Sequence, residues 1–328
     1  MKRFNGRHIV VTGGAGFIGS HLVEALMADG AAVTVLDNFS TGKRENIQPF
    51  IRQSAFRLIE GDIRDAGACS AAMAGADAVL HEAALGSVPR SIADPVASAA
   101  VNITGFVTVL HCAARLGIRR VVYASSSSVY GDCTDSPKTE ARTGRALSPY
   151  ALTKRVDELF AENFHELYGT DCLGLRYFNV FGPRQDPASQ YAAVIPRFIT
   201  ALLAGRSPEI YGDGSNSRDF TYIDNVVQAN LRALEVTEPA ALNRNYNIAC
   251  GAATSLNTLF AGIRQALAQH EPRTAAITAV YRPPRPGDIP HSLADISLAR
   301  QRLGYSPQVC VAEGLRRTAQ WYWQEAQP

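Results

Sequence analysis

The stretch "VVTGGAGFIGSHL", residues 10–22, decides the fold of this chain. It joins a β-branched run, typical of a buried strand, to apolar residues at helical spacing that end before Gly30. Gly13, Gly16 and Gly19 stand at the junction in the spacing G-x-x-G-x-x-G. Glycines there let backbone N–H groups approach a pyrophosphate, and the helix N-terminus adds a favourable partial positive charge. The stretch therefore predicts a dinucleotide-binding turn, with a plain tight turn as the alternative.

Strand and helix patterns alternate through the first half of the chain. Strands are predicted at "RHIVVTGG", "AAVTVLDN", "FRLIEGD", "DAVLHEAA", "RRVVYASS" and "TDCLGLRYFNV", and helical patterns at about 66–75, 95–117 and 149–168. Such alternation favours right-handed crossovers and a parallel sheet. We therefore predict an α/β fold with a doubly wound parallel sheet of the Rossmann type.

The composition changes after about residue 180. "NVFGPRQDP", "YGDGSNSRDF" and "YRPPRPGDIPHS" are rich in Pro, Gly and Arg, and the short helical pieces "AVIPRFITALLAGR" and "SLNTLFAGIRQALAQ" lie between them. We predict a cofactor-binding domain at 1–179 and a smaller, loop-rich α/β substrate domain at 180–328. The segment near 218–246 is expected to pack with the first domain.

The bulk composition excludes several classes of protein. Of the 328 residues, 46% are apolar and 19% charged, with a net charge of +2, so no basic patch is expected to attract nucleic acid or an anionic membrane. We expect no apolar run that reaches the length of a membrane span and no secretory apolar region. The six cysteines and seven histidines show no metal-ligand spacing, which predicts reduced thiols, no metal site and a cytoplasmic location.

The end of the second predicted strand indicates which dinucleotide binds. Asp37 stands 18 residues after Gly19, where a carboxylate accepts both ribose hydroxyls and repels a 2′-phosphate. No arginine directly follows it, although the basic pair at 43–44 leaves NADP open, and we favour NAD. Asp62 and Ile63 in "GDIRD" either face the adenine or form an ordinary strand end.

The helix that begins in "LSPYALTKRVDELF" carries a possible base. Ser148 is a favourable N-cap and Pro149 suits the first helical position. Tyr150 and Lys154 are i and i+4 and share one face. An ammonium beside a phenol favours the phenolate, which is a competent general base for a hydroxyl. A tyrosine ring packed on a lysine stem is the alternative.

A run of four serines in "YASSSSVYGD", residues 123–132, lies 24 residues upstream of this pair. Serine runs are usually flexible linkers. This run ends a predicted strand, and in a doubly wound sheet strand ends and helix N-termini meet at the ligand crevice. We therefore predict that the serines and the Tyr-x-x-x-Lys pair face the same site.

Taken together, "TGGAGFIG", "SSSSVYG" and "YALTK" resemble the extended short-chain dehydrogenase/reductases, nearly end to end. "RYFNVFGPRQDP", "YGDGSNSRDFTYIDNV" and "RPPRPGDIPHSLAD" narrow the resemblance to enzymes of sugar nucleotides. "EAALGSVPRSIADP" and "YAAVIP" are similar to the bacterial UDP-N-acetylglucosamine 4-epimerases, which are allied to UDP-galactose 4-epimerases.

The resemblance implies a redox epimerisation with tightly bound NAD. Tyr150 would take the proton of the sugar 4-hydroxyl, Lys154 would orient the nicotinamide ribose, and the 4-keto sugar would turn and be reduced on its other face. Ser126, four residues before the tyrosine of "VYG", would be the catalytic serine, with Ser127 as a second contact. Related dehydratases carry acids where this chain has Ser127 and Ser128, which argues against dehydration.

Further site residues follow from the resemblance alone. It implies NAD contacts by Gly13, Gly16, Phe17, Ile18, Gly19, Asp37, Asn38, Ser40, Thr41, Gly42, Asp62, Ile63, Ala83, Ala84, Asn102, Tyr150, Lys154 and Tyr177. It implies substrate contacts by Gly86, Ser87, Arg90, Ser126, Ser127, Tyr150, Asn179, Val194, Arg218, Arg285, Asp288 and Ser292. Ser292 replaces a bulky tyrosine of galactose-only enzymes, which predicts a preference for UDP-GlcNAc and UDP-GalNAc.

Some alternatives remain at this stage. The helices at 101–116 and 150–168 carry apolar residues on more than one face, which predicts either a homodimer through a four-helix bundle or internal packing. The substrate is alternatively UDP-Glc, UDP-Gal or a uronic form such as UDP-GlcNAcA. The protein is alternatively a dehydratase, a decarboxylase, or a non-catalytic NAD sensor.

Overall fold

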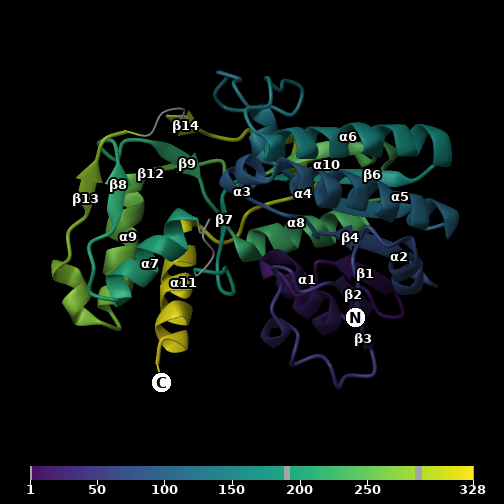
Figure 1. Cartoon of the computed structure of the whole chain (residues 1–328), viewed down its shortest axis with the longest axis horizontal. Coiled ribbons are helices and arrows are strands. Elements are labelled where there is room, and N and C mark those ends of the chain that lie inside the picture. Colours follow the sequence, from purple (N-terminus) through teal and green to yellow (C-terminus); the bar gives the residue numbers. More distant parts are fainter. Residues whose placement is uncertain (1, 188–192, 285–289, 328) are drawn as a thin grey trace.

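The computed structural model describes residues 2–187, 193–284 and 290–327. Figure 1 shows a large sheet with its helices on one side of the molecule and a smaller group of strands and helices, which ends in α11, on the other. The predicted α/β fold with a doubly wound parallel sheet is confirmed.

Seven parallel strands form the large sheet, in the order β11-β6-β5-β4-β1-β2-β3. They are β1 (His8–Thr12), β2 (Ala32–Asp37), β3 (Phe56–Glu60), β4 (Ala78–His81), β5 (Arg120–Ser126), β6 (Asp171–Tyr177) and β11 (Arg244–Ile248). The order reverses between β1 and β4, so a crevice is expected at the carboxyl ends of these two strands.

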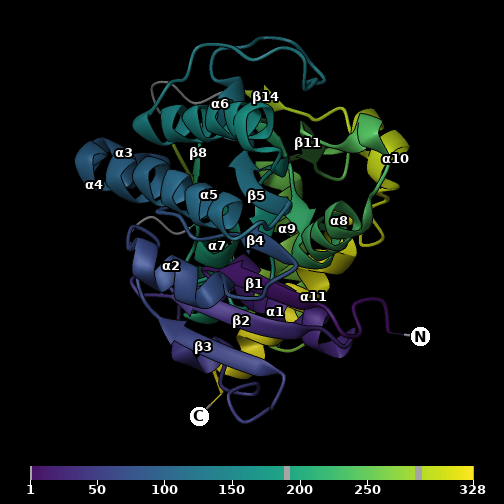
Figure 2. The ribbon, with the colours of Figure 1, turned by 90° about the vertical axis from the view of Figure 1, so that its right-hand side faces the viewer.

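Helices cover both faces of this sheet, as Figure 2 shows from one end. One face carries α2 (Ala66–Met73), α4 (Pro95–Ala99), a π-helical turn (Ala100–Thr104), α5 (Gly105–Arg115) and α6 (Pro149–Tyr168), and the other carries α1 (Phe17–Ala28) and α8 (Ile223–Glu235). Because strand side chains alternate, Val10 packs in the core on the α5 side and Val11 in the core on the α1 side. Both residues are fully buried.

The smaller part, as far as the structure describes it, consists of short strands and the helices α7, α9 and α11. The strands pair as β7 (Val180–Phe181) with β10 (Thr221–Tyr222), β8 (Glu209–Tyr211) with β13 (Val280–Arg282), and β9 (Ser217–Asp219) with both β12 (Ala253–Ser255) and β14 (His291–Ser292). The helices are α7 (Val194–Leu203), α9 (Leu256–Ala268) and α11 (Val311–Glu325), whereas α10 (Ser297–Leu303) packs against β11 and α8 of the large sheet. A short helix, α3 (Val88–Ala93), precedes α4.

The chain passes between the two parts more than once. It leaves the large sheet after β6, returns to it through α8 and β11, and leaves again after residue 248. A second return, through α10, precedes α11. Segment 218–246 was expected to pack with the first domain, and within it α8 covers the sheet while β11 pairs with β6. The large sheet therefore contains chain from beyond residue 180.

One helical run has the dimensions of a membrane span. Pro95–Arg115 passes by length and composition, with a mean hydropathy of 1.6 and 44% of that window buried. The expectation that the chain holds no such run is therefore wrong. Phe106, Val109 and Leu110 of this run are fully buried in the core between helices and sheet. Core helices of soluble proteins have the same length and hydropathy, so the run is weak evidence for a membrane.

Candidate functional site

A cleft of about 540 Å³ follows the carboxyl ends of the large sheet, from the glycine turn to α6. Every predicted NAD contact except Gly42 and Asn102 lines this cleft. The predicted substrate contacts that line it are Gly86, Ser87, Ser126, Ser127, Tyr150 and Asn179. The glycine turn, the serine run and the Tyr-x-x-x-Lys pair therefore share one site.

The glycine turn fits a pyrophosphate. Gly13 has a φ of +69°, and a Cβ built on it would lie 2.7 Å from the amide nitrogen of Ala83. A Cβ on Gly19 would lie 2.1 Å from the carbonyl oxygen of Gly13, so the turn tolerates no side chain at either position. Gly16 is the N-cap of α1, and no side chain caps this helix. The N–H groups of the first turn therefore face the cleft, as an anion-binding helix end requires.

Two carboxylates stand at the adenosine end predicted for NAD. Asp37 accepts hydrogen bonds from the N–H groups of Ala15 (2.9 Å) and Phe39 (2.8 Å), and burial raises its pKa. The guanidinium of Arg64 holds the pKa of Asp62 at about 2. An ionised group at each strand end suits the hydroxyls of a ribose, and the residues present fit NAD.

Local capping explains how α6 presents its functional side chains. The Ser148 hydroxyl accepts the N–H of Ala151 at 3.1 Å, and proline occupies the first turn, as predicted. The N–H of Tyr150 donates to the Ser91 hydroxyl of α3 at 3.0 Å. These bonds fix the start of the helix where its first turn meets the cleft.

The serine run is a strand end followed by a short 3₁₀ turn, not a linker. The Ser126 hydroxyl accepts the N–H of Ser128 at 3.1 Å and so caps this turn. Ser127 also lines the cleft, whereas the hydroxyl of Ser128 is buried with no partner among the residues that the structure describes. Neither can act as a carboxylic acid.

Lys154 is buried beside the end of β5. Its Nζ donates to the Ala124 carbonyl oxygen at 2.9 Å and to Asp157 Oδ2 at 3.3 Å. Burial alone would lower the pKa of Lys154, but the charge of Asp157 and the phenol of Tyr150 outweigh it, so the pKa is raised. Lys154 is therefore a permanent cation within the cleft at neutral pH.

Sequence reasoning missed Glu82, which lines the cleft just after β4. Its Oε1 accepts the phenolic hydrogen of Tyr177 at 2.8 Å, and Asn230 Nδ2 donates to the same phenol at 2.9 Å. Burial raises the pKa of Glu82 to about 8, although the Tyr177 bond opposes this. The signal available in the sequence was an acid placed directly after the buried strand in "DAVLHEAA".

A buried ion pair supports the serine run from behind. Arg176 donates Nε to Glu158 Oε1 (2.8 Å) and Nη2 to Oε2 (2.9 Å), and their side chains are 2% and 0% exposed. The Ser125 hydroxyl donates to Glu158 at 2.7 Å, and Arg176 also reaches the Tyr130 phenol at 3.0 Å. Ser125 therefore anchors the strand end before Ser126.

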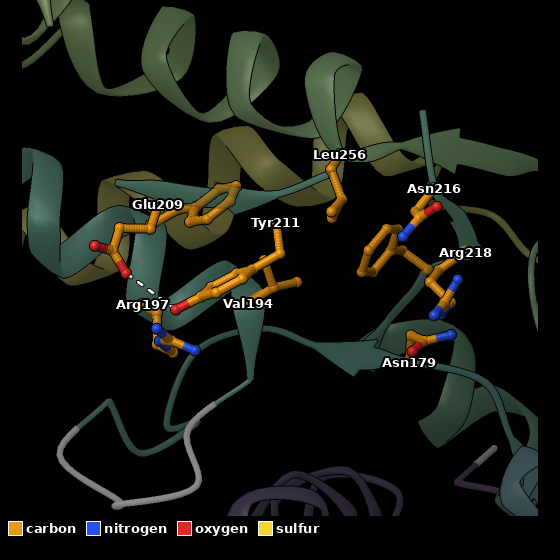
Figure 3. A pocket seen from close by; sticks show the side chains of 10 residues that line it. Asn179, Val194, Arg197, Glu209, Tyr211, Asn216, Arg218 and Leu256 are labelled. Carbon is orange, nitrogen blue, oxygen red and sulfur yellow. Dashed lines mark hydrogen bonds between the residues drawn. The ribbon is translucent and has the colours of Figure 1, made fainter. Parts of the chain in front are cut away.

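A second pocket of about 250 Å³ lies in the smaller part, and Asn179 lines both it and the cleft. Figure 3 shows Asn179 and Arg218 at one end and Arg197, Glu209 and Tyr211 at the other. The predicted residues Asn179, Val194 and Arg218 line it. The residues that sequence reasoning missed are Arg197, Phe198, Glu209, Tyr211, Asn216, Phe220 and Leu256.

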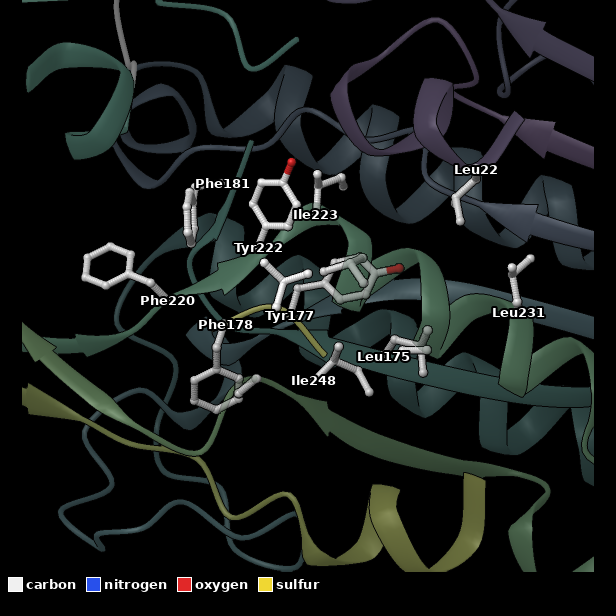
Figure 4. Close-up of a cluster of buried hydrophobic side chains, with 14 of the residues drawn as sticks. Leu22, Leu175, Tyr177, Phe178, Phe181, Phe220, Tyr222, Ile223, Leu231 and Ile248 are labelled. Atoms are coloured by element: carbon white, nitrogen blue, oxygen red, sulfur yellow. The ribbon is translucent and has the colours of Figure 1, made fainter. Parts of the chain in front are cut away.

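A cluster of buried aromatic side chains lies in the smaller part of the molecule, close to Asn179. Figure 4 shows Phe181, Phe220 and Tyr222 close to one another. The ring of Phe181 lies 5.7 Å from that of Tyr222 and 6.4 Å from that of Phe220. Each is nearly fully buried, which contributes about 1.5–3 kcal/mol per side chain. Asn179, which has the unusual φ of 37°, is held next to this cluster by its Nδ2, which donates to the Asp219 carbonyl oxygen at 3.0 Å, and by its carbonyl oxygen, which accepts the N–H of Thr221 at 3.2 Å.

The predicted NAD contacts Asn102 and Gly42 line neither the cleft nor the second pocket. Asn102 is buried, where its Oδ1 accepts the N–H of Leu85 at 2.8 Å and so supports the wall from behind. The nearest neighbours of Gly42 are Ala15 and the Asp37 carboxylate.

The other predicted substrate residues are placed as follows. Arg90 is in α3, Ser292 pairs with Arg218 between β14 and β9, and Arg285 and Asp288 lie outside the described residues. Within residues 2–187, 193–284 and 290–327, no group of three or more potential metal ligands occurs.

Comparisons with known proteins agree with this geometry. Residues 9–249 match the model of the NAD dependent epimerase/dehydratase family. A UDP-glucose 4-epimerase of Mycolicibacterium smegmatis is 39% identical over 97% of this chain and 99% of its own length.

Two solved structures have the same fold. The UDP-N-acetylglucosamine 4-epimerase from Methanobrevibacter ruminantium M1, in complex with UDP-N-acetylmuramic acid, has a TM-score of 0.91 and 41% identity, covering 98% of this chain and 100% of the other. A dTDP-glucose 4,6-dehydratase from Streptomyces venezuelae with NAD bound has a TM-score of 0.86 and 34% identity, covering 97% of each chain. The chain therefore belongs to the NAD-dependent epimerase/dehydratase family, within the extended short-chain dehydrogenase/reductases, and is an enzyme whose cofactor is NAD.

Proposed function

We propose that this enzyme reversibly inverts C4 of UDP-N-acetylhexosamines, between UDP-GlcNAc and UDP-GalNAc, through a transient 4-keto sugar. The observation that carries the proposal is the cleft itself, which Ser126, Tyr150 and Lys154 line together while Ser127 and Ser128 offer no acid to expel water. Redox inversion needs a base, a cation and a hydroxyl donor at one carbon, and these three residues supply them.

Each side chain has a distinct task. Bound NAD supplies the hydride acceptor and returns the hydride. Tyr150 takes the proton of the 4-hydroxyl and gives it back after the sugar has turned. Lys154, held by Ala124 and Asp157, supplies the positive charge that favours the phenolate. The Ser126 hydroxyl, fixed by the 3₁₀ turn, bridges the sugar oxygen.

The second pocket suits the nucleotide part of the substrate. Asn179 borders both cavities, so a diphosphate near it would join a sugar in the cleft to a uridine in the pocket. Arg218 lines the same pocket, and a guanidinium can bond two phosphate oxygens at once. The ring of Tyr211 offers an apolar face to a pyrimidine.

The direct test is to incubate purified enzyme with UDP-GlcNAc, without added cofactor, and to separate the products by chromatography. UDP-GalNAc without net NADH is the expected result. A keto sugar that has lost water would instead indicate the dehydratase activity of other family members, and an unchanged substrate would indicate an NAD sensor. A kinetic comparison of UDP-Gal, UDP-GalNAc and UDP-GalNAcA ranks the substrates.

Ser292→Tyr is expected to lower kcat/KM for UDP-GlcNAc and UDP-GalNAc about 10- to 100-fold and to spare UDP-Glc and UDP-Gal. The reason is the resemblance to galactose-only enzymes, whose bulky tyrosine at this position narrows the sugar site, and overpacking of this kind costs about 1–3 kcal/mol. Ser292 itself pairs with Arg218 between β14 and β9 and lines neither the cleft nor the second pocket. The control is Ser292→Ala, which should turn over all four sugars. If the Ser292→Tyr enzyme turned over the acetylated sugars at the rates of the parent enzyme, the gatekeeper role of Ser292 would be contradicted.

We further propose a homodimer through the face formed by α3, α4 and α6. Large apolar side chains are exposed there, among them Ile92 (63%), Val96 (77%), Leu152 (54%) and Leu159 (49%). Leu152 and Leu159 are seven residues apart and so share one face of α6. A second copy would cover this apolar face, as exposed patches of this kind indicate.

Val96→Glu with Leu159→Glu is expected to convert the dimer to a monomer in sedimentation velocity, because two charges per copy would be buried without partners. Ile51→Glu is the matched control, since Ile51 is 43% exposed in the segment before β3 and should leave the dimer intact. A monomeric parent enzyme would refute the proposed interface.

A further inference from the structure

Asp157 lies one helical turn after Lys154 on α6 and is as deeply buried as the lysine. Its side chain is 1% exposed and that of Lys154 is 3% exposed. Asp157 Oδ2 is 3.3 Å from the lysine Nζ, which also donates to the Ala124 carbonyl oxygen at 2.9 Å. The lysine that the reaction needs is thus held between the end of β5 and a carboxylate on its own helix.

Stability does not explain why an acid occupies this position. A buried carboxylate is costly unless hydrogen bonds satisfy it, and Asp157 Oδ1 has no partner among the described residues. A buried ion pair contributes little to folding compared with apolar side chains of similar volume. An incompletely satisfied acid beside a catalytic cation is therefore more consistent with a role in the chemistry.

Other charged or titratable groups near the pair have partners of their own. The groups that interact with Lys154 or Asp157 from the packed elements are His81 at the end of β4, Glu82 directly after it, Tyr123 on β5 and Glu158 on α6. His81 bonds Thr12, Glu82 bonds Tyr177, Tyr123 bonds Asn245, and Glu158 bonds Arg176. Among the described residues, Asp157 is the one carboxylate within bonding distance of the lysine.

We propose that Asp157 is a positioning residue that fixes the ammonium of Lys154 and offsets its charge, and so sets the pH range in which Tyr150 exchanges its proton. The inference rests on the proposed roles of Tyr150 and Lys154. The geometry explains both parts: one contact orients the Nζ toward Ala124, and one negative charge 3.3 Å away weakens the field that the lysine exerts on the phenol.

The sign of the effect follows from the charge. Removing a negative charge from a buried site makes neighbouring groups release protons at lower pH. Asp157→Asn keeps the shape and removes the charge, so the phenolate of Tyr150 should form at lower pH, and Lys154 should also lose its proton at lower pH. Both limbs of the pH–rate profile are expected to move down by about one pH unit.

The experiment is a spectrophotometric titration of tyrosinate in the full-length, NAD-loaded protein without sugar. The signal of Tyr150 is obtained by subtracting the same titration of a matched Tyr150→Phe protein, in the parent and in the Asp157→Asn background. The midpoint should fall by about one pH unit in Asp157→Asn and stay near that of the parent in Asp157→Glu, which keeps the charge. Glu166→Gln removes an exposed acid of the same helix and should not change the titration midpoint of Tyr150.

An Asp157→Asn protein that titrates like the parent would overturn the proposal, even if its activity or stability fell, because a purely structural role would produce only those losses. The readout does not depend on the sugar. If no UDP-sugar is turned over, the proposed function fails while the titration still decides the role of Asp157. The pH–rate profile with UDP-GlcNAc then gives the second measurement where turnover is found.

Discussion

Tyr150→Phe is expected to lower kcat for C4 inversion about 10³-fold while KM changes little. The ring and its packing remain, but the one atom that takes and returns the proton is gone, and a positioned acid–base group contributes roughly 10²- to 10⁴-fold. The interactions proposed for the nucleotide lie in the second pocket, which Tyr150 does not line, and are untouched. Chromatographic rates over a range of UDP-GlcNAc concentrations separate the two parameters.

Tyr168→Phe is the control for this substitution. Tyr168 ends the same helix and is 56% exposed, so the loss of its hydroxyl should leave both parameters unchanged. Bound NAD, measured after denaturation, should be the same in all three proteins. A Tyr150→Phe enzyme that keeps more than about a tenth of the parent rate would assign the base to another group, because a positioned base contributes far more than this.

Arg176→Met is expected to lower the free energy of unfolding by about 3 kcal/mol, because it removes the buried two-bond partner of Glu158 and leaves only the partly exposed Arg155, 3.0 Å away, to balance the buried carboxylate. The pair has 0–2% side-chain exposure and two short bonds, so solvent cannot replace the arginine. Urea unfolding, followed by circular dichroism, measures the change. The serine run rests on the same carboxylate through Ser125, so activity should fall as well.

Two further variants test the physical reason. Arg316→Met removes an exposed cation, 45% accessible and paired with Glu313, and should cost less than about 1 kcal/mol. Adding Glu158→Gln to Arg176→Met removes the buried carboxylate charge, which then has only Arg155 as a partner, and should restore part of the lost stability. If Arg176→Met were as mild as Arg316→Met, the buried pair would not be important for folding.

Local sequence patterns predicted much of this fold. The strand, the glycine turn and the first helix are specified within residues 8–28, where β-branched residues, backbone freedom and apolar spacing act over a few positions. The N-cap at Ser148 was predictable for the same reason, since a cap needs only residues three positions apart. The parallel sheet then followed from the alternation of elements.

Contacts between distant segments were not predictable in this way. Glu158 meets Ser125 across 33 positions, and the bond from Tyr177 to Glu82 spans 95. Only the packed sheet brings such residues together, and in the sequence each is an ordinary polar residue. Asp157 is visible in the sequence three residues after Lys154. Its proposed positioning role depends on its burial and on the Oδ1 that has no partner among the described residues, and no sequence pattern reveals either.

The apolar helical run Pro95–Arg115 shows that a sequence pattern can be present and still not identify the environment of a helix. Neither apolar length nor hydropathy states what covers a helix. Here α2, α6 and the sheet lie against the run.

The residues of the second pocket were also largely missed by the sequence analysis, because they come from four separate segments of a loop-rich region.

The repeated passage of the chain between its two parts has a mechanical consequence. Connections near residues 178–180, 222–223 and 248–250 join the large sheet to the smaller part, and the chain returns to the sheet through α10 before it reaches α11, so rotation about a single hinge would bend several crossings at once. The cleft should then open by local movement of loops rather than by separation of two bodies. Such stiffness suits an enzyme that oxidises and reduces the same molecule in one turnover, because its cofactor has no need to exchange.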